Sequence, residues 1–456
     1  MRSSSSFEPG ENDLTQEILG QFPFLNGYTH AACGFQLAAD AAVDEIVTSL
    51  CRSVTQLVTQ IPLLSGQVVH SPGAPGSSGR YLPAPWPASP PYEPVRVKDC
   101  SSQLPSFTQL ARANVPIGLL GGDILLPCPG LPDPHGLTGP VPILIVQANF
   151  IRGGLILNVS THHNILDACA LARILGLLGT LLKGRSLSAA DLQHANRPRT
   201  DIIPLLAADE PIKDFSYLRR PPGWTPSLPS SPFQWCTFRF PLSGLASLRQ
   251  TATVPAGPRL SDDDILSAWV WQRVSAIRIA RGIPPSRMSK YTRAIDGRAS
   301  MGLPAGYLGH LVHHAISQLP LSTVASAPLA EIARTMRRDL QAANTAWALR
   351  SYATFLANEP DKSVLLYGGP RNPDVDLGGS SLLDLEAVED KEGLSFGPLL
   401  GPRRFGRKPG TAVIPGCVYF QPLEANAIPL VVCLPEEDIK ALKRDGEWRR
   451  LVRFVG

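Results

Sequence analysis

The most informative pattern of apolar and polar positions lies in residues 141–184. Two apolar runs, 143–150 and 155–159, flank a turn that contains Gly153 and Gly154. Short β-rich runs around a glycine turn predict a β-hairpin. The residues that follow are almost wholly apolar, and a helix that is apolar on nearly every face is normally buried. The pattern therefore predicts a hairpin that leads into a buried helix.

Three other segments carry helical signals. Residues 41–60 repeat apolar side chains at helical spacing, and Asp40 is predicted to cap this helix. Ser261 is the expected N-cap of a second helix, because three aspartates follow it in the first turn, where the helix dipole favours negative charge. Gly282 is expected to end that helix. A further helix is expected around residues 328–347.

Strand-like runs and Pro/Gly-rich connections alternate with these helices. The strand signals of the second half lie at residues 235–240, 363–366, 412–420 and 430–433. Residues 71–94 are rich in Pro, Gly and Ser, which predicts a loop. A similar connection at 219–232 lies near the middle of the chain and carries no periodicity, so we predict an interdomain linker there. The sequence thus predicts an α/β or α+β protein of two lobes, residues 1–218 and 233–456.

Length, composition and charge narrow the classes of function. A chain of 456 residues is expected to fold into two or more domains, and its 44% hydrophobic and 18% charged residues are typical of globular proteins. The formal net charge of +4 is too small and too dispersed to indicate a nucleic-acid partner. Eight cysteines form no C-x-x-C pair, which favours free thiols in a reducing compartment. The N-terminus lacks an apolar signal core and no run of ~20 uncharged apolar residues exists, so we expect a cytoplasmic protein without a membrane span.

Two polar residues stand where the predicted hairpin meets the predicted helix. His163 is a candidate general base, because an imidazole near its ordinary pKa can take a proton from a hydroxyl or an amine. Asp167, four residues on, could hold His163 directly, or it could turn away and fix the loop through an arginine. The alternative is that His162 and His163 are ordinary residues at a strand end and that Asp167 is a carboxylate in the first turn of a helix. The H-x-x-x-D spacing alone does not decide between these hypotheses.

Other kinds of site have weaker support. A metal site could join the H-x-x-x-D residues to His310, His313 or His314, but the close-set ligands typical of zinc motifs are missing, so we expect no metal. The sequence has no G-x-S-x-G motif for a serine hydrolase and no Walker or G-x-G-x-x-G loop. Cys169 lies within the predicted buried helix, where an inert thiol is expected.

Several motifs occur together, in the order in which one known family has them. They read PLLSG at 62–66, LARANVPIGLLGGDILLP at 110–127, HHNILDA at 162–168, SDDDILSAWVW at 261–271, AIDGRASMGLPAGYLGH at 294–310, GSSLLD at 379–384 and LSFGPLLG at 394–401. Over residues 15–454 the chain resembles the BAHD, or HXXXD-type, acyltransferases, especially their fungal branch similar to trichothecene 3-O-acetyltransferase. The combination is far more specific than any single motif and favours the catalytic interpretation of His163.

The resemblance implies two lobes like those of chloramphenicol acetyltransferase, each a mixed β-sheet flanked by helices, with a channel between them. Acyl-CoA would be a co-substrate, no cofactor would be bound permanently, and the protein would be a monomer. His163 would take the proton from the acceptor hydroxyl as it attacks the thioester, without an acyl-enzyme, because holding both substrates at one imidazole supplies the proximity. Asp167 would be structural and would pair with Arg298, which matches the family's D-x-R segment.

The same resemblance implies residues for the two substrates. Ser380 would contact the thioester oxyanion, for which a hydrogen-bond donor is required. Gly306, Tyr307 and Gly309 match the family's Y-F-G-N region beside the pantetheine arm, and together with Ser381 they would bind CoA.

Two segments depart from the family pattern. The family's D-F-G-W-G reads Ser395-Phe396-Gly397-Pro398-Leu399, and Ala168 stands where glycine usually follows the motif aspartate. The function we expect is transfer of an acyl group, expected to be acetyl, from acyl-CoA to a hydroxyl of a hydrophobic secondary metabolite. The alternatives are a CoA-independent enzyme on the same fold, acting by cyclisation, condensation or acyl exchange, and a non-catalytic relative that binds ligands.

Overall fold

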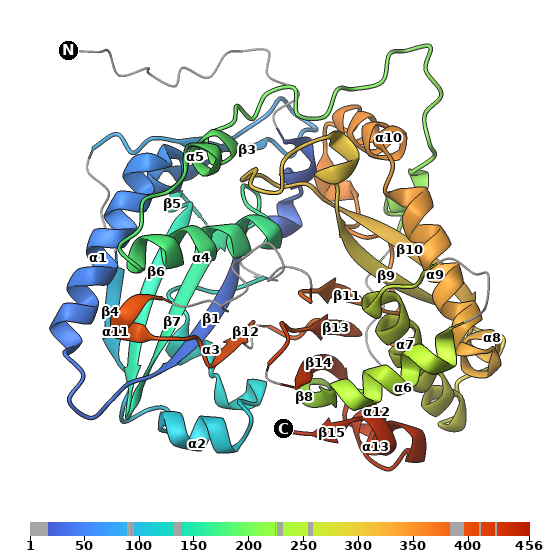
Figure 1. Cartoon of the computed structure of the whole chain (residues 1–456). Coiled ribbons are helices and arrows are strands. Elements are labelled where there is room, and N and C mark those ends of the chain that lie inside the picture. Colours follow the sequence, from blue (N-terminus) through green and yellow to red (C-terminus); the bar gives the residue numbers. More distant parts are fainter. Residues whose placement is uncertain are drawn as a thin grey trace.

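Two β-sheets stand side by side, and helices cover the outer side of each (Figure 1). The computed structural model describes residues 17–88, 93, 95–131, 138–223, 225, 231–253, 259–383, 396–409, 412–424 and 426–456. Both parallel and antiparallel pairs occur in each sheet, so the mixed two-lobed architecture that the resemblance implied is present.

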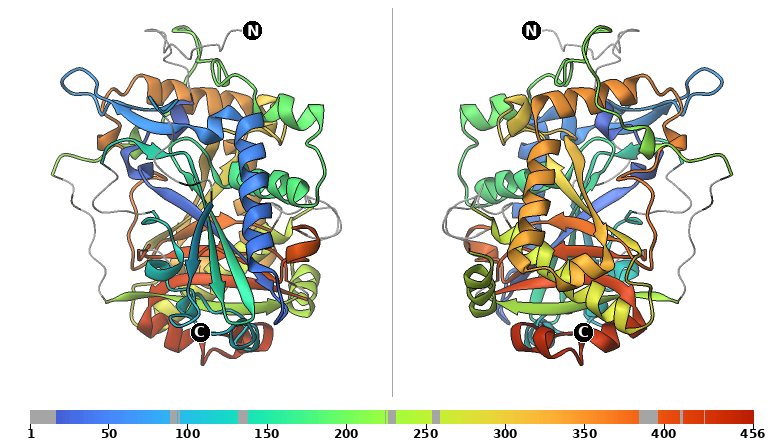
Figure 2. Two further views of the ribbon diagram at one scale, coloured as in Figure 1. Left: turned by 90° about the vertical axis from the view of Figure 1, so that its left-hand side faces the viewer. Right: turned by 90° about the vertical axis from the view of Figure 1, so that its right-hand side faces the viewer.

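The first lobe is built on a five-stranded sheet of order β12-β1-β7-β6-β4. The strands are β1 (Tyr28–Gln36), β4 (Val95–Asp99), β6 (Leu144–Ile151), β7 (Gly154–His162) and β12 (Phe405–Arg407). β6 and β7 form the predicted antiparallel hairpin, and the predicted buried helix that follows is α4 (Ala168–Leu182). α4 and α1 (Val43–Gln60) supply the apolar side chains that bury this sheet, and Figure 2 shows α1 lying across its outer face.

Smaller elements complete this lobe. A three-stranded sheet of order β3-β2-β5 contains β2 (Gln67–Ser71), β3 (Arg80–Ala84) and β5 (Val141–Pro142). The short helices are α2 (Phe107–Arg112), α3 (Gly122–Leu125), α5 (Ala189–Ala195) and α11 (Gly397–Leu400). The 3₁₀ turns are η1 (Ile18–Gly20), η2 (Pro23–Leu25), η3 (Pro62–Ser65), η4 (Ile117–Leu119) and η5 (Ser216–Leu218).

The second lobe is built on a seven-stranded sheet of order β10-β9-β11-β13-β14-β8-β15. Its strands are β8 (Phe233–Pro241), β9 (Met288–Asp296), β10 (Val312–Pro320), β11 (Leu377–Ser381), β13 (Cys417–Phe420), β14 (Ala427–Pro435) and β15 (Arg453–Phe454). Its helices are α6 (Leu242–Ala252), α7 (Asp262–Ala280), α8 (Leu321–Ser326), α9 (Leu329–Ala343), α10 (Ala346–Ala357), α12 (Glu436–Leu442) and α13 (Gly446–Leu451), with 3₁₀ turns η6 (Ala299–Met301) and η7 (Lys362–Val364). In Figure 2, α9 lies over β9 and β10 on the outer side.

The helix predicted from Ser261 shows why local signals succeed here. The Ser261 hydroxyl accepts a hydrogen bond from the Asp264 amide, and the Asp264 carboxylate accepts one from the Ser261 amide, which is a complete capping box. At the other end Gly282 has a φ of 98°, a conformation that glycine adopts without strain. Both predicted ends of α7 are confirmed.

Other local predictions were wrong. α1 has no side-chain cap and begins at Val43 after Ala42, three residues beyond Asp40. Part of the predicted loop 71–94 is β3, because its backbone pairs with β2. The strand predicted at 363–366 falls on η7. The single helix predicted at 328–347 is divided into α9 and α10, because the Thr345 hydroxyl accepts a hydrogen bond from the Ala348 amide and starts a new helix.

A segment from the second half of the sequence completes the first sheet. β12 pairs antiparallel with β1, with Cys33 opposite Gly406. Just before it, Phe396 packs into the first core, with its ring centroid 4.9 Å from that of Phe35. The connection 219–232 joins η5 to β8, with residues 224 and 226–230 outside the described part, and a domain boundary there stays a prediction.

A third apolar cluster holds the two lobes together. It joins side chains of the N-terminal η1 and η2, such as Leu19 and Leu25, to side chains of the second half, such as Leu311 and Leu349. No helix among the described residues is long and apolar enough to cross a bilayer. None of the eight cysteines forms a disulfide bond in this structure.

Candidate active site

The turn between β7 and α4 places the H-x-x-x-D residues at the junction of the lobes. β7 is buried along its whole length, and its pairing continues into the turn, because the His163 amide donates to the Gly27 carbonyl at 2.8 Å. Asp167 caps α4, accepting a hydrogen bond from the Ala170 amide at 2.9 Å. Asp167 is thus the N-cap residue rather than part of the first helical turn, which corrects the expectation from the sequence.

The imidazole of His163 has a defined tautomer. Its Nδ1 lies 3.2 Å from the Leu166 carbonyl oxygen, which can only accept, so Nδ1 carries the proton and Nε2 keeps its lone pair. Burial lowers the pKa of His163 to about 3, helped by His310 and Lys408 and opposed by Asp167. His163 is therefore neutral at physiological pH, which is the form that a general base requires.

Asp167 does not touch His163; it pairs with Arg298. The two side chains form a two-pronged ion pair, with Nη1 2.9 Å from Oδ2 and Nη2 3.0 Å from Oδ1, and they are 0% and 2% exposed. Burial alone would raise the pKa of Asp167, but Arg298 holds it below its ordinary value. The ion pair that the resemblance implied is therefore present. Arg298 also donates to the carbonyls of Tyr307 and Gly309, so it joins the turn to the second lobe.

A second buried arginine holds the same turn from another side. Arg199 donates to the carbonyls of Ile165 at 2.8 Å and Leu308 at 2.6 Å, and it forms an ion pair with Glu17. The Tyr307 hydroxyl also donates to Glu17, at 2.6 Å. No pattern in the sequence singles out Arg199 or Glu17, because neither belongs to a motif and they are far apart in sequence.

His163 opens into a cavity of about 120 Å³ between the lobes. Its walls come from β1, α4, the end of β11, the segment around β12 and the segment after β13. The lining residues are Thr29, His30, Ala31, Ala32, Cys33, His163, Ala168, Leu171, Ala172, Leu175, Ser380, Leu382, Arg403, Gly406, Arg407, Lys408, Tyr419, Gln421 and Pro422. Ser380 and Ala168, two residues singled out from the sequence, thus share this cavity with His163.

The four residues expected to bind CoA lie outside the His163 cavity. Gly306, Tyr307, Gly309 and Ser381 are not among the residues that line the cavity. A Cβ added at Gly309 would lie 1.9 Å from a Glu17 oxygen, so this glycine permits close packing of the Tyr307 and Glu17 side chains. A role of these four residues in CoA binding stays a prediction.

The altered D-F-G-W-G segment lies against the first core. Ser395 is outside the described residues. Phe396 is 1% exposed, and Gly397 has a φ of 80°, with an added Cβ only 2.1 Å from the Leu182 carbonyl oxygen. The described part of this segment therefore packs against the end of α4.

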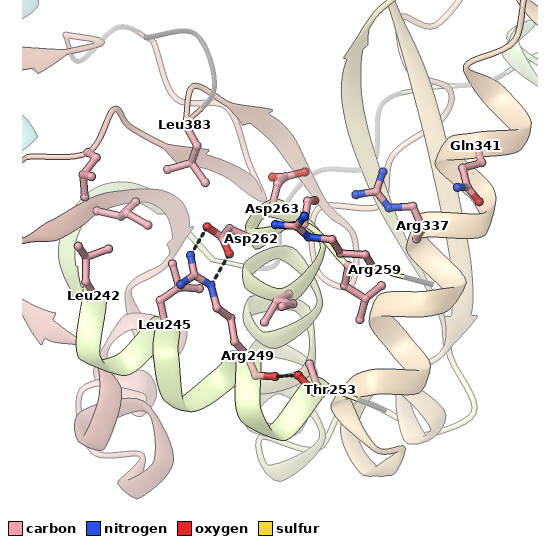
Figure 3. A pocket seen from close by; sticks show the side chains of 16 residues that line it. Leu242, Leu245, Arg249, Thr253, Arg259, Asp262, Asp263, Arg337, Gln341 and Leu383 are labelled. Atoms are coloured by element: carbon pink, nitrogen blue, oxygen red, sulfur yellow. Dashed lines mark hydrogen bonds and ion pairs between the residues drawn. The ribbon is translucent and has the colours of Figure 1, made fainter. Parts of the chain in front are cut away.

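A larger groove of about 1040 Å³ lies beside the N-terminus of α7. Figure 3 shows Arg249, Arg259 and Arg337 around it, with Arg249 joined to Asp262. The groove and the His163 cavity are lined by consecutive residues at two places, Leu382 with Leu383 and Pro422 with Leu423. The two hollows therefore approach each other just beyond the ends of β11 and β13.

Rival sites find little support in this geometry. Within the described parts of the chain, no three His, Cys, Asp or Glu side chains gather where they could hold a metal ion. Burial raises the pKa of the Cys169 thiol well above its ordinary value, which disfavours the reactive thiolate.

Comparison with known proteins agrees with this geometry. Residues 131–448 match the Transferase family, and residues 28–181 match the trichothecene 3-O-acetyltransferase-like N-terminal domain. The chain is 39% identical to O-acetyltransferase SAT5 of Stachybotrys chartarum over 100% of this chain and 98% of that protein. It is 36% identical to O-acyltransferase pigD of Monascus ruber over 97% and 99% of the two chains.

Solved structures extend the likeness to the fold. The Fusarium sporotrichioides TRI101 structure in complex with coenzyme A and T-2 superposes with a TM-score of 0.86, at 26% identity, over 97% of this chain and 99% of that chain. Vinorine synthase, at 13% identity and a TM-score of 0.61 over 98% and 96% of the two chains, shares the fold. The chain therefore belongs to the Transferase family, the BAHD acyltransferases, and is an acyl-CoA-dependent O-acyltransferase.

Proposed function

We propose that this enzyme transfers an acetyl group from acetyl-CoA to a hydroxyl of a small hydrophobic secondary metabolite, with His163 as the general base. The observation that carries the proposal is the unprotonated Nε2 of a neutral, fixed imidazole beside a cavity between the lobes. The relatives named above as O-acetyltransferase and O-acyltransferase, and the TRI101 complex with coenzyme A, support the choice of donor.

The proton would move in two steps. His163 Nε2 takes the proton of the acceptor hydroxyl while its oxygen attacks the thioester carbonyl, and the resulting imidazolium returns a proton to the departing CoA thiolate. The low pKa of His163 does not prevent this, because the negative charge that develops on the reacting oxygen favours the imidazolium. The Leu166 carbonyl would keep the ring oriented throughout, and Asp167 and Arg298 would keep the turn in place.

Ser380 is our candidate donor to the oxyanion. It lines the same cavity as His163, and a hydroxyl can donate to a developing negative oxygen. A donor of this kind contributes about 3–4 kcal/mol to transition-state stability in other acyl-transfer enzymes. Replacement of Ser380 is therefore expected to lower kcat more than it raises either KM.

The groove beside α7 is our candidate site for the nucleotide end of CoA. It is large, it carries three arginines, and it adjoins the reaction cavity. Arg249 already pairs with Asp262, and Arg337 with Asp264, so Arg259 is the cation in this groove with no recorded ion pair among the described residues. We also propose a monomer in the cytoplasm, the latter because none of the eight cysteines forms a disulfide bond.

Replacement of His163 tests the proposal. The purified enzyme, with acetyl-CoA and a panel of hydrophobic alcohols, is expected to release CoA thiol and form acetyl esters. His163→Ala is expected to lower kcat/KM by about 10²–10⁴-fold, the usual contribution of a general base. His70→Ala, at an exposed histidine, is the matched control. Activity of His163→Ala within a few-fold of the unaltered enzyme would exclude the proposed mechanism.

A further inference from the structure

One wall of the reaction cavity carries an unusual cation, Lys408. It directly follows β12, the strand that the second half of the chain adds to the first sheet. Its amide donates to the Gln421 side chain at 3.0 Å and its ammonium donates to the Tyr419 hydroxyl at 3.2 Å. The ammonium also lies 4.6 Å from the centre of the Tyr419 ring. The side chain is thus fixed at the cavity wall by neutral groups.

The charges around this cation are not balanced. Among the described residues that line the cavity, three are Lys or Arg and none is Asp or Glu. Arg407 is neutralised by Glu424, whose Oε2 lies 2.9 Å from its Nη2. For Lys408, no carboxylate lies within ion-pair distance in the described part of the chain. A tyrosine hydroxyl leaves two of the three ammonium N–H groups for another acceptor.

The positive charge of the Lys408 ammonium influences the catalytic imidazole. Lys408 lies close enough to His163 and His30 to lower the pKa of both imidazoles. His30 stays neutral, with a pKa of about 3, so it adds no positive charge to the wall. Burial lowers the pKa of Lys408 itself, as expected for a cation that lacks a nearby counter-charge. An anion bound here would remove that penalty, because a buried charge is stabilised when it is paired.

We propose that Lys408 is the anion-binding residue of the acceptor site, and that the acceptor carries an ionised oxygen, a carboxylate or an acidic enol or phenol, besides the hydroxyl that is acetylated. This inference rests on the proposed function of the cavity. The cavity is too small for a whole metabolite, so it holds the reacting end of the acceptor, and the ionised oxygen lies within that end.

The CoA phosphates are the main rival for this cation. The arginines of the groove beside α7 lie outside the cavity, in a space that is large enough for a nucleotide. Lys408 instead lies with β1 and α4 around His163. The two candidate sites for an anion are therefore lined by different residues, and binding and kinetic experiments can tell them apart.

The test compares acids with their neutral analogues. Hydroxylated aromatic carboxylic acids are paired with their methyl esters, and hydroxylated 1,3-diketones with their O-methyl enol ethers. Binding of each member to the full-length enzyme is measured by calorimetry without acetyl-CoA, and acetyl transfer is measured separately. We expect the acid or the enol to bind more tightly than its neutral partner. Lys408→Gln is expected to lower that preference by about ten- to hundredfold, the value of a charge-assisted hydrogen bond.

Two further variants complete the design. Lys408→Arg keeps the charge and is expected to restore most of the preference. Lys443→Gln is the matched control, since Lys443 is exposed and lies over the Phe454 ring. A larger preference within the carboxylic acid and methyl ester pairs would identify the ionised group as a carboxylate, and a larger preference within the diketone and enol ether pairs would identify it as an acidic enol.

Three results would overturn the inference. The first is that the unaltered enzyme binds acids and their neutral partners equally well. The second is that Lys408→Gln weakens the binding of acids and of neutral partners by the same factor. The third is that Lys408→Gln raises the KM for acetyl-CoA without changing the preference for acids. Failure of acetyl transfer with every compound would count against the proposed function alone, because the binding measurement does not depend on turnover.

Discussion

Two sides of one cavity are built in opposite ways. On the His163 side, a short turn directs its polar groups into fixed partners, and Asp167 is bound by Arg298 and by two backbone amides. On the Lys408 side, a cation faces the same cavity, and a tyrosine hydroxyl is the one side-chain partner of its ammonium among the described residues. We call the first side the satisfied side, because the protein itself supplies the partners of the Asp167 carboxylate and of His163 Nδ1, which suits groups that must keep one geometry. The second side leaves hydrogen-bonding capacity for a ligand, which suits recognition.

The largest effect is expected from a substitution that removes the ion pair of the satisfied side. Arg298→Met leaves the buried Asp167 without its cation, and such a loss costs about 3–5 kcal/mol of unfolding free energy. Arg450→Met is the matched control, because Arg450 and Glu447 are 63% and 56% exposed, and such pairs contribute about 0–1 kcal/mol. Denaturant unfolding of both variants measures the difference. Equal stability of the two variants would show that the ion pair does not hold the turn.

Low pH is expected to reduce the stability of the folded protein through His162, the neighbour of His163. Burial lowers the pKa of His162 to about 3, whereas an unfolded histidine has a pKa of about 6.5. Between these values the unfolded chain binds the additional proton, so the unfolding free energy falls as the pH drops below 6.5. At pH 5 the expected cost is about 2 kcal/mol for this one group.

Replacement of His162 isolates that contribution. The loss of stability of His162→Gln between pH 7 and pH 5 should be smaller than that of the unaltered enzyme by about 2 kcal/mol. Denaturant unfolding at the two pH values measures it. An identical pH dependence in both proteins would mean that His162 has the same pKa in the folded and the unfolded state.

The smallest effect is expected from a substitution beside Lys408, on the recognition side of the cavity. Tyr419→Phe removes the hydroxyl that accepts a hydrogen bond from the Lys408 ammonium but leaves the aromatic ring and the charge in place. The charge that attracts the acid stays and only the orientation of the ammonium is lost, so the preference for acids should change by only about two- to tenfold. Calorimetry with the same acid and ester pairs measures this change. A loss as large as that of Lys408→Gln would assign the recognition to Tyr419 instead.

The sequence predicted the satisfied side far better than the recognition side. The hairpin, the turn with His163 and the buried helix are consecutive in sequence, and the capping box of α7 spans four residues, so local signals are enough to predict them. The pairing of Asp167 with Arg298 came from the family resemblance, because 131 residues separate the two. Lys408 carried no signal. It reaches the cavity only because β12 pairs with β1 from the other half of the chain, which no local pattern encodes.

The position of β12, a strand of the C-terminal half that joins the first sheet, also limits how the specificity of the enzyme can change in evolution. Because β12 and Lys408 belong to the C-terminal half of the sequence but complete the sheet that carries His163, the two halves cannot be recombined freely. A chimera joined at 219–232 would bring a foreign edge strand to β1 and a foreign wall to the cavity at the same time. Acceptor preference would then follow the donor of the C-terminal half, while the base would come from the other parent. New specificities should therefore arise more readily by substitutions around residues 403–408 than by exchange of whole lobes.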